Sequence, residues 1–241
     1  MAHTLFISDL HLCEEQAHTA QLFLNFLRDT APQAEALYIL GDLFEYWAGD
    51  DDLDTPFHCS ITDALHALGR QGTRIYLMHG NRDLLMGDAL AQACHATLLP
   101  DPTLIDLYGT STLLSHGDIL CTDDLKYQAF RRQVRDPQWR AAFLAQPLAK
   151  RKAQIEEIRT ISKSEKSIKS MDIMDVNGDA VADLLRAHRY PRLIHGHTHR
   201  RALHQHAVDG HLCERWVLGD WHQTGNALLC EAHGCRSIDL A

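Results

Sequence analysis

The sequence lacks any long hydrophobic run. Although 45% of its 241 residues are apolar, no stretch approaches the roughly 18 uninterrupted apolar residues of a membrane-spanning helix. The amino terminus, Met1-Ala2-His3-Thr4, has no basic segment leading into an apolar signal core. We therefore expect a cytoplasmic protein, long enough to bury a substantial core and to form one catalytic domain over residues 1–241.

Paired cysteines are also missing. The seven cysteines are an odd number, they are scattered, and none forms a Cys-x-x-Cys pair. Neither a disulfide framework nor a thiolate zinc site is therefore indicated. We expect all seven to be reduced thiols, most of them acting as small buried apolar residues.

Positive charge is scarce outside one segment. The formal net charge of −9 argues against a general nucleic-acid binder. Between residues 126 and 170, however, 12 Lys and Arg stand against four Asp and Glu, so this segment carries +8 and the rest of the chain −17. Such asymmetry predicts an anionic partner for the basic segment.

Apolar runs alternate with helical patterns through the first half of the chain. Strands are predicted over residues 4–8, 36–40 and 74–78, and helices over 20–27, 61–68 and 83–93. Shorter strands follow at 103–107 and 111–115, and again at 192–194, 202–207, 215–218 and 227–231. Residues 123–188 read as helical, which makes them an insertion between strands. The order predicts an α/β fold with ligands at the carboxyl ends of the strands.

Five short polar motifs each follow one of the predicted strands. They are Asp9-x-His11, Gly41-Asp42, Gly80-Asn81-Arg82-Asp83, His116-Gly117-Asp118 and Gly196-His197-Thr198-His199. Their oxygen and nitrogen donors suit manganese, iron or zinc, and no thiolate is among them. Residues two apart on an extended segment point to the same side, so Asp9 with His11, and His197 with His199, can each present two donors.

Any one of these motifs alone is weak evidence, because a single histidine is more often a turn residue or a core residue than a ligand. Five motifs after five strands are different, since their consistent placement distinguishes a site from a chance match. We therefore predict one site for divalent metal at this edge of the sheet.

The five motifs together resemble the calcineurin-like metallophosphoesterase family, a sandwich of mixed β-sheets flanked by helices. Within it they are closest to the diphosphatases that act on UDP-2,3-diacylglucosamine in lipid A biosynthesis. The resemblance implies two divalent ions, most simply Mn²⁺. One would be held by Asp9, His11, Asp42 and His199, and the other by Asp42, Asn81, His116 and His197, with Asp42 bridging. It implies Asp42, Asn81, Arg82 and His116 as catalytic residues.

Arg82 departs from the broader family, in which most members have a histidine that protonates an alcohol leaving group. Arginine has a pKa above about 12 and cannot donate a proton near neutrality. It can grip a phosphate through two N–H groups. We therefore expect a leaving group that departs without a proton, namely a phosphate released from a diphosphate.

The helical insertion combines basic and apolar residues, which suits a substrate that is anionic at one end and apolar at the other. Phe130, Val134, Trp139 and Phe143 recur at near-helical spacing among its basic residues. We interpret it as a lid, an interfacial membrane contact, or both; a solvated helical hairpin is the alternative. The resemblance implies substrate contacts at Asn81, Arg82, Asp124, Ser162, Lys166, Lys169 and His197, although Lys166 stands where an asparagine is expected.

The resemblance implies release of UMP and 2,3-diacylglucosamine 1-phosphate, with the chain held peripherally at the cytoplasmic face of the inner membrane. Two other functions remain open. The first is a phosphodiesterase or phosphatase for a soluble nucleotide or phosphoprotein, which would keep the metals but not the lipid. The second is a metal-binding scaffold without catalysis, which would be expected to lack ligands, whereas all seven positions are filled.

Overall fold

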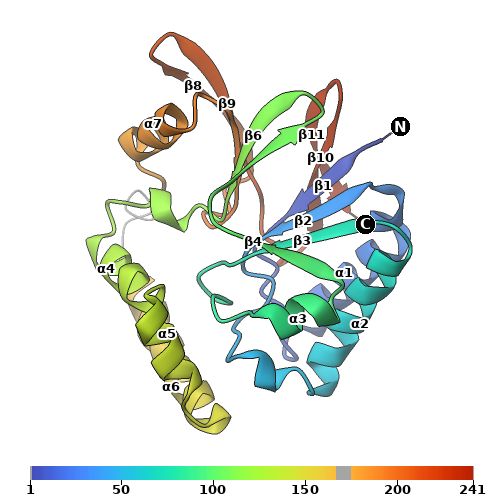
Figure 1. Ribbon diagram of the computed structural model, residues 1–241, viewed down its shortest axis with the longest axis vertical. Coiled ribbons are helices and arrows are strands. Elements are labelled where there is room, and N and C mark those ends of the chain that lie inside the picture. The colour runs from blue at the N-terminus through green and yellow to red at the C-terminus, as the bar shows by residue number, and fades with distance from the viewer. Residues whose placement is uncertain (1, 167–174, 241) are drawn as a thin grey trace.

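Two β-sheets form the centre of the structure, a computed structural model that describes residues 2–166 and 175–240 (Figure 1). The first sheet has the strand order β11-β10-β1-β2-β3-β4. Its strands are β1 (Thr4–Ile7), β2 (Ala36–Leu40), β3 (Arg74–Met78), β4 (Ala96–Leu99), β10 (Gly225–Glu231) and β11 (Gly234–Leu240). β1 to β4 run parallel, while β10 and β11 pair antiparallel at the other side.

The second sheet has the order β5-β6-β7-β9-β8. Its strands are β5 (Thr103–Leu107), β6 (Thr110–Ser115), β7 (Arg192–His195), β8 (Ala202–Val208) and β9 (His211–Val217). β6, β7 and β9 are parallel, and β5 and β8 are antiparallel edge strands. The fold is thus the α/β sandwich of mixed sheets that the motifs predict.

Alternation along the strands explains why both faces of the first sheet are buried. In β1, Leu5 and Ile7 pack toward the helices, whereas Phe6 points to the other side and packs against Leu114 and Ile194 of the second sheet. Successive side chains of a strand face opposite ways, so a continuous apolar run fits a strand covered on both faces. The helices on the first sheet are α1 (Ala17–Asp29), α2 (Pro56–Arg70) and α3 (Asp88–Ala93).

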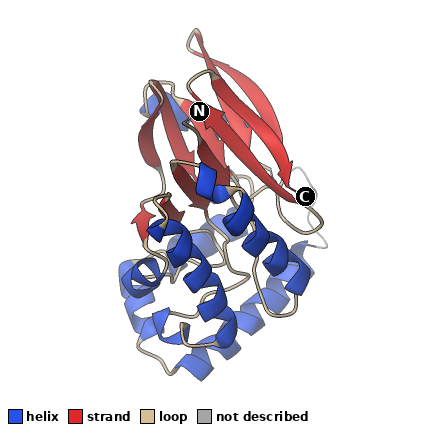
Figure 2. Ribbon diagram, turned by 90° about the vertical axis from the view of Figure 1, so that its right-hand side faces the viewer, coloured by secondary structure: helices blue, strands red, loops and turns tan. Residues whose placement is uncertain are grey.

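The second sheet is covered on its outer face by α7 (Gly178–Ala187), through Val181 and Leu185. Three further helices leave the sheets and extend from one side of the molecule (Figure 1, lower left). They are α4 (Leu125–Val134), α5 (Pro137–Leu144) and α6 (Leu148–Lys166). In the orthogonal view of Figure 2 the strands occupy one half of the molecule and most helices the other. The insertion therefore stands beside the sandwich.

Three short 3₁₀ helices connect these elements: η1 (Ala31–Gln33), η2 (Asp50–Asp52) and η3 (Asp118–Leu120). Within the described residues, no helix is both long enough and apolar enough to cross a bilayer.

The predicted helix over 83–93 was wrong at its start, because α3 begins only at Asp88. The carboxylate of Asp83 instead accepts backbone N–H groups from the loop itself and from the loop after β2. The first amides of α3 are held by Asp50, which accepts from Gly87, Ala89 and Leu90. A side chain distant in sequence therefore sets where this helix begins.

The expectation that all cysteines are reduced was also wrong for one pair. Cys230 and Cys235 face each other across the β10–β11 hairpin and form a disulfide, with Cα atoms 4.1 Å apart. Strand β11 was not predicted, so the expected strands did not place these two residues opposite each other. The other five cysteines are free thiols.

Candidate metal centre

The carboxyl ends of five strands meet at one place, and each carries one of the five motifs. β1, β2 and β3 come from the first sheet, and β6 and β7 from the second. The loops are fastened to one another, because the N–H groups of Asp9 and His11 donate to the carbonyls of Gly41 and Asp42, and that of Gly196 donates to His116. All seven predicted ligands are thereby brought together.

Backbone strain is concentrated on these residues. Ten non-glycine residues of the described chain have positive φ, and five of them are predicted ligands with φ between 52° and 67°. They are Asp9, His11, Asp42, His197 and His199. Left-handed backbone costs free energy for residues with a Cβ and gathers at functional sites. This concentration marks the strand ends as a site shaped for chemistry.

One half of the cluster is built around Asp9. Its Oδ1 lies 3.3 Å from Nε2 of His199, and its Oδ2 accepts the hydroxyl of Ser8 and, at 2.9 Å, the N–H of His197. Nε2 of His11 lies 3.8 Å from Oδ2 of Asp42. Donor atoms of Asp9, His11 and His199 fall within 4.8 Å of one another, a spacing at which one ion can bind all three.

The other half is built around His116. Its Nε2 lies 3.9 Å from Oδ1 of Asp42 and 3.1 Å from Oδ1 of Asn81. The same amide oxygen is 2.9 Å from Nδ1 of His197. Asp42 therefore stands between the two halves, with one oxygen toward His11 and the other toward His116.

The electrostatics of the cluster call for added positive charge. Burial opposes protonation of His116, but the carboxylates of Asp42 and Asp9 outweigh it and raise its pKa to about 9. In the same way Asp220 and Asp9 overcome burial and raise the pKa of His199 to about 10. Protons thus balance the buried carboxylates, a role that divalent cations can fill more completely.

Several buried donor atoms form ion pairs but no hydrogen bond, in a way that fits a metal. Oδ1 of Asp9 and both ring nitrogens of His11 are buried and form no hydrogen bond among the described residues. A buried polar atom without a partner costs about 1–3 kcal/mol unless something else binds it. Carboxylate and imidazole are common ligands for divalent transition metals, so the residues present fit such ions.

The similarity of the sequence to a known protein family agrees with a site for divalent metal. The pattern of the calcineurin-like phosphoesterase family matches residues 2–201.

The chain belongs to the calcineurin-like phosphoesterases.

Relatives within this family cover almost the whole chain. The chain is 57% identical to a UDP-2,3-diacylglucosamine hydrolase of Aromatoleum aromaticum, over 95% of this chain and 94% of the relative. Proteins of the same name from Aeromonas hydrophila and Xanthomonas axonopodis pv. citri are 49% and 48% identical, covering 94% and 99% of each chain. The predicted family and fold, and the use of divalent metal that the family implies, are confirmed.

In this phosphoesterase the loops after β2 and β3 are joined by Asp83, which is completely buried. Its carboxylate accepts N–H groups from Gly80 at 2.8 Å, from Leu43 at 2.7 Å and, over longer distances, from Asp42 and Phe44. Burial, followed by the nearby carboxylate of Asp42, raises its pKa to about 6. Asp83 therefore fixes the backbone that carries two predicted ligands, a role that the sequence motif did not reveal.

Replacing Asp83 with asparagine is expected to lower the free energy of unfolding by about 3 kcal/mol, because an amide NH₂ would face backbone donors and leave them unsatisfied. Thermal or urea unfolding of the metal-free protein measures the loss. The exposed Asp106, which accepts the N–H of Gly109 at 2.7 Å, provides a matched Asp→Asn control with a much smaller effect. Equal stability of the two variants would show that Asp83 does not fasten the loops.

Two further acids at the site were missed. Oε2 of Glu45 lies 3.1 Å from Nδ1 of His11, and Oδ2 of Asp220 accepts from Nδ1 of His199 at 3.0 Å. Asp220 could have been found, because Asp220-x-His222 after β9 repeats the spacing of Asp9-x-His11. Glu45 could not, since nothing in the sequence shows that it turns back toward His11.

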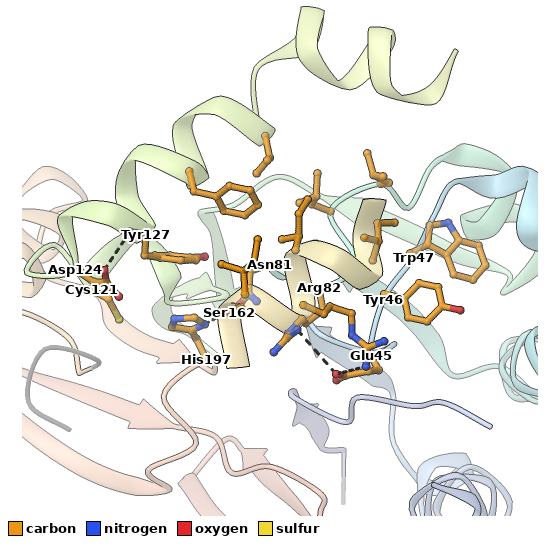
Figure 3. Close-up of a pocket in the computed structure, with 18 of the residues that line it drawn as sticks. Glu45, Tyr46, Trp47, Asn81, Arg82, Cys121, Asp124, Tyr127, Ser162 and His197 are labelled. Carbon is orange, nitrogen blue, oxygen red and sulfur yellow. Dashed lines mark hydrogen bonds and ion pairs between the residues drawn. The ribbon is translucent and has the colours of Figure 1, made fainter. Parts of the chain in front are cut away.

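A cavity of about 500 Å³ opens beside the predicted ligands (Figure 3). Asn81, Arg82 and His197 lie at one end, and the inner faces of α4, α5 and α6 form the far walls. Its apolar lining includes Leu84, Leu85, Phe130, Val134, Trp139, Phe143, Ile155, Ile158 and Ile161. The cavity is therefore polar where it meets the metal centre and apolar along the insertion.

The residues predicted to contact the substrate differ in where the structure places them. Arg82, Asp124 and Ser162 line this cavity, and Asp124 also caps α4 by accepting the N–H of Tyr127 at 3.1 Å. Lys166 is the last residue of α6, and nothing is described of its side chain. Lys169 lies outside the described residues.

Many basic residues of the insertion are matched by acids of the sandwich. These pairs are Arg131 and Arg135 with Asp118, Arg151 with Asp51, Lys152 with Asp52, and Arg159 with Glu45. The opposite charges of the two parts therefore attach the insertion to the rest of the molecule. Acids of the sandwich therefore balance much of the positive charge of the insertion, which had suggested an external anionic partner.

Two histidines outside the ligand set have structural contacts. His79 lies 2.7 Å from the carbonyl of Met86 through Nε2, and His195 lies 3.1 Å from the guanidinium of Arg215. Burial, followed by Arg215, lowers the pKa of His195 to about 3. Both rings therefore support neighbouring backbone and strands.

Proposed function

We propose that the protein hydrolyses the diphosphate of UDP-2,3-diacylglucosamine by water attack at the α-phosphorus, releasing UMP and 2,3-diacylglucosamine 1-phosphate. The observation that carries this proposal is the cavity described above, which joins a cluster of metal-type donors to an apolar groove. Diacylated sugar needs such a groove, since burying each CH₂ contributes about 0.8 kcal/mol. The names of the relatives agree with this substrate.

Two divalent ions, most simply Mn²⁺, are assigned to two adjacent positions. The first position consists of Asp9, His11, Asp42 and His199, and the second of Asp42, Asn81, His116 and His197. Support comes from the two half-clusters and from the placement of the oxygens of Asp42 between them. When bound, such a pair lowers the pKa of water and offsets charge that develops on the phosphoryl oxygens.

Arg82 binds the diphosphate in this proposal and does not act as an acid. Its backbone N–H donates to Oδ1 of Asp42 at 2.8 Å, which places the residue directly beside the proposed bridge. Its guanidinium lines the cavity and lies 3.9 Å from Glu45. A permanently charged group here favours a phosphate leaving group, which needs no proton to depart.

The helices α4 to α6 serve in this proposal as a lid within a single catalytic domain over residues 1–241. Their apolar inner faces hold the acyl chains, while Asp124, Ser162, Lys166 and Lys169 contact the polar part of the substrate. A substrate that resides in a membrane requires access to the bilayer. Peripheral association with the cytoplasmic face of the inner membrane is therefore part of the proposal.

Hydrolysis by purified protein tests the function directly. With Mn²⁺ and UDP-2,3-diacylglucosamine, mass spectrometry is expected to find UMP and the lipid 1-phosphate, and EDTA is expected to stop the reaction. A panel with p-nitrophenyl phosphate and alkyl phosphates tests the role assigned to Arg82. Preferential turnover of alkyl phosphates would contradict the diphosphate assignment, and turnover of soluble nucleotides alone would favour the rival phosphodiesterase.

Replacing Ile158 with serine is expected to weaken use of the lipid substrate. Ile158 lines the cavity from α6, and burying such a side chain contributes about 1.5–3 kcal/mol, so kcat/KM is expected to fall by roughly 10-fold or more. The partly exposed Leu203 on β8 provides a control, because Leu203→Ser removes apolar surface away from the cavity. Equal losses with a substrate that lacks acyl chains would show that Ile158 does not contact them.

A further inference from the structure

The two proposed metal positions differ in the charge of their ligands. The first contains the carboxylate of Asp9 in addition to the shared Asp42, whereas the second contains the neutral amide of Asn81 in the corresponding place. Each position has two imidazoles. Because ligand charge raises affinity for a divalent cation, the first position has the stronger intrinsic attraction.

The carboxylates that face the histidine ligands increase this difference in negative charge between the two positions. In the first position both histidines have a carboxylate at Nδ1. Oε2 of Glu45 lies 3.1 Å from His11, near enough for charge attraction, and Oδ2 of Asp220 accepts a hydrogen bond from His199 at 3.0 Å. A carboxylate behind a ligating histidine fixes the ring and raises its basicity. Both partners lie outside the proposed ligand set.

In the second position the described contacts of Nδ1 are with neutral oxygens, and that of His197 is with Oδ1 of Asn81 at 2.9 Å. Nδ1 of His116 lies 2.9 Å from the carbonyl oxygen of Leu40, a neutral partner. The buried carboxylate nearby, Asp118, is matched by Arg131 at 2.8 Å and Arg135 at 3.2 Å. Its charge is therefore taken up within the protein.

Glu45 also contacts the substrate side of the site, where it lies beside Arg82 (Figure 3). Its Oε1 lies 2.8 Å from Arg159 on α6 and 3.9 Å from Arg82, while its other oxygen lies 3.1 Å from His11. These arginines offset part of its charge but leave the second oxygen directed at the ring. Two effects of Glu45 must therefore be separated by experiment, namely its support of His11 and its attachment of α6.

We propose that the two positions bind their ions with unequal affinity, the first tightly and the second weakly, and that Glu45 and Asp220 are the positioning residues that produce the difference. The inference rests on the two-ion assignment of the proposed function. It implies that the second ion is the exchangeable one and that protein with one ion bound is an isolable species.

Titration of metal-free protein with Mn²⁺ alone tests this, with free Mn²⁺ followed by electron paramagnetic resonance. Two steps are expected, the first about 10-fold or more tighter than the second. His197→Ala is expected to remove the weak step and keep the tight one. Glu45→Gln and Asp220→Asn are each expected to weaken the tight step by about 10- to 100-fold while leaving the weak step in place.

Arg159→Gln is the matched control, because it removes the contact of Glu45 with α6 but keeps the carboxylate beside His11. It is expected to leave the tight step unchanged. A loss equal to that of Glu45→Gln would show that Glu45 acts only through α6. Equal affinity of the two steps in the unmodified protein, or a tight step unaffected by both acid variants, would overturn the proposal.

Thermal unfolding in EDTA verifies that each variant is folded. Asp220 is partly exposed, with a side-chain accessibility of 33%, so Asp220→Asn still gives a result if Glu45→Gln proves unstable. No substrate is present in these titrations. Unequal binding without hydrolysis would reject the proposed function and keep this inference, and hydrolysis with equal binding would do the reverse.

Discussion

Replacing Asp42 with alanine is expected to lower kcat by about 10³-fold or more, since loss of the carboxylate that we propose to bridge the two ions would remove several kcal/mol of charge stabilisation at the phosphoryl group. The structure places one oxygen of Asp42 3.8 Å from His11 and the other 3.9 Å from His116. Steady-state kinetics with saturating Mn²⁺ measures the loss.

The same variant is expected to remain folded without metal, because removing one acid from a buried group offsets the loss of the hydrogen bond that Asp42 accepts from the N–H of Arg82. Asp42 lies in a buried group of acids with Asp9 and Asp83, and like charges in a dry site oppose folding. Asp63→Asn, on the exposed face of α2, provides a control with normal activity and stability. An Asp42→Ala variant that keeps more than about a tenth of its activity would contradict the bridging role.

Replacing Gly80 with alanine is expected to reduce kcat/KM by about 10²-fold, because even a 1 Å shift of a reacting group has an effect of this size. A Cβ at this position would overlap both the amide nitrogen and Oδ1 of Asp42. The neighbouring Gly41 cannot move aside easily, since it has φ of +92° and is itself packed against Gly80. Overpacking is also expected to lower the free energy of unfolding by about 1–3 kcal/mol.

Gly178→Ala provides the matched control. Gly178 is the first residue of α7, and a Cβ there would meet no atom within 4 Å. Activity should be unchanged, and the melting temperature equal or slightly higher, because alanine favours helix over glycine. If both variants kept full activity, the close contact between the loops after β2 and β3 would not matter for catalysis.

Much of this architecture was predictable because the apolar patterns that indicate the strands end directly before the polar motifs that form the site. Apolar runs gave the strands that lead into the site, and each ends directly before a polar motif. In parallel strands those ends lie at one edge, so Asp9, Asp42 and Asn81 had to come together. In the second sheet the parallel strands β6 and β7 bring His116 and His197 to the same edge for the same reason.

The rest depended on contacts between distant parts of the chain. Strands β4 and β11 lie at the two edges of the first sheet, and their weak patterns are resolved only by pairing with β3 and β10. The start of α3 is set by Asp50, some 40 residues upstream. Tertiary contacts override local propensity in such places.

The function of the basic segment was the least predictable feature. A run of Lys and Arg shows a charge excess but not what balances it, and here acids such as Asp118 and Asp52 of the sandwich take up a large share. What the sequence did convey was the apolar spacing, and Phe130, Val134, Trp139 and Phe143 do line the cavity. The apolar pattern therefore described the segment better than its charge.

Diffraction from crystals grown with Mn²⁺, with anomalous maps recorded at the manganese edge, tests the central claim most directly. Two peaks are expected roughly 3.5–4 Å apart, with Asp42 between them and the donors of Asp9, His11 and His199 around one and those of Asn81, His116 and His197 around the other. A single peak in crystals soaked with enough Mn²⁺ to saturate the weaker position, or peaks at other side chains, would contradict the claim that these five loops form a dinuclear centre.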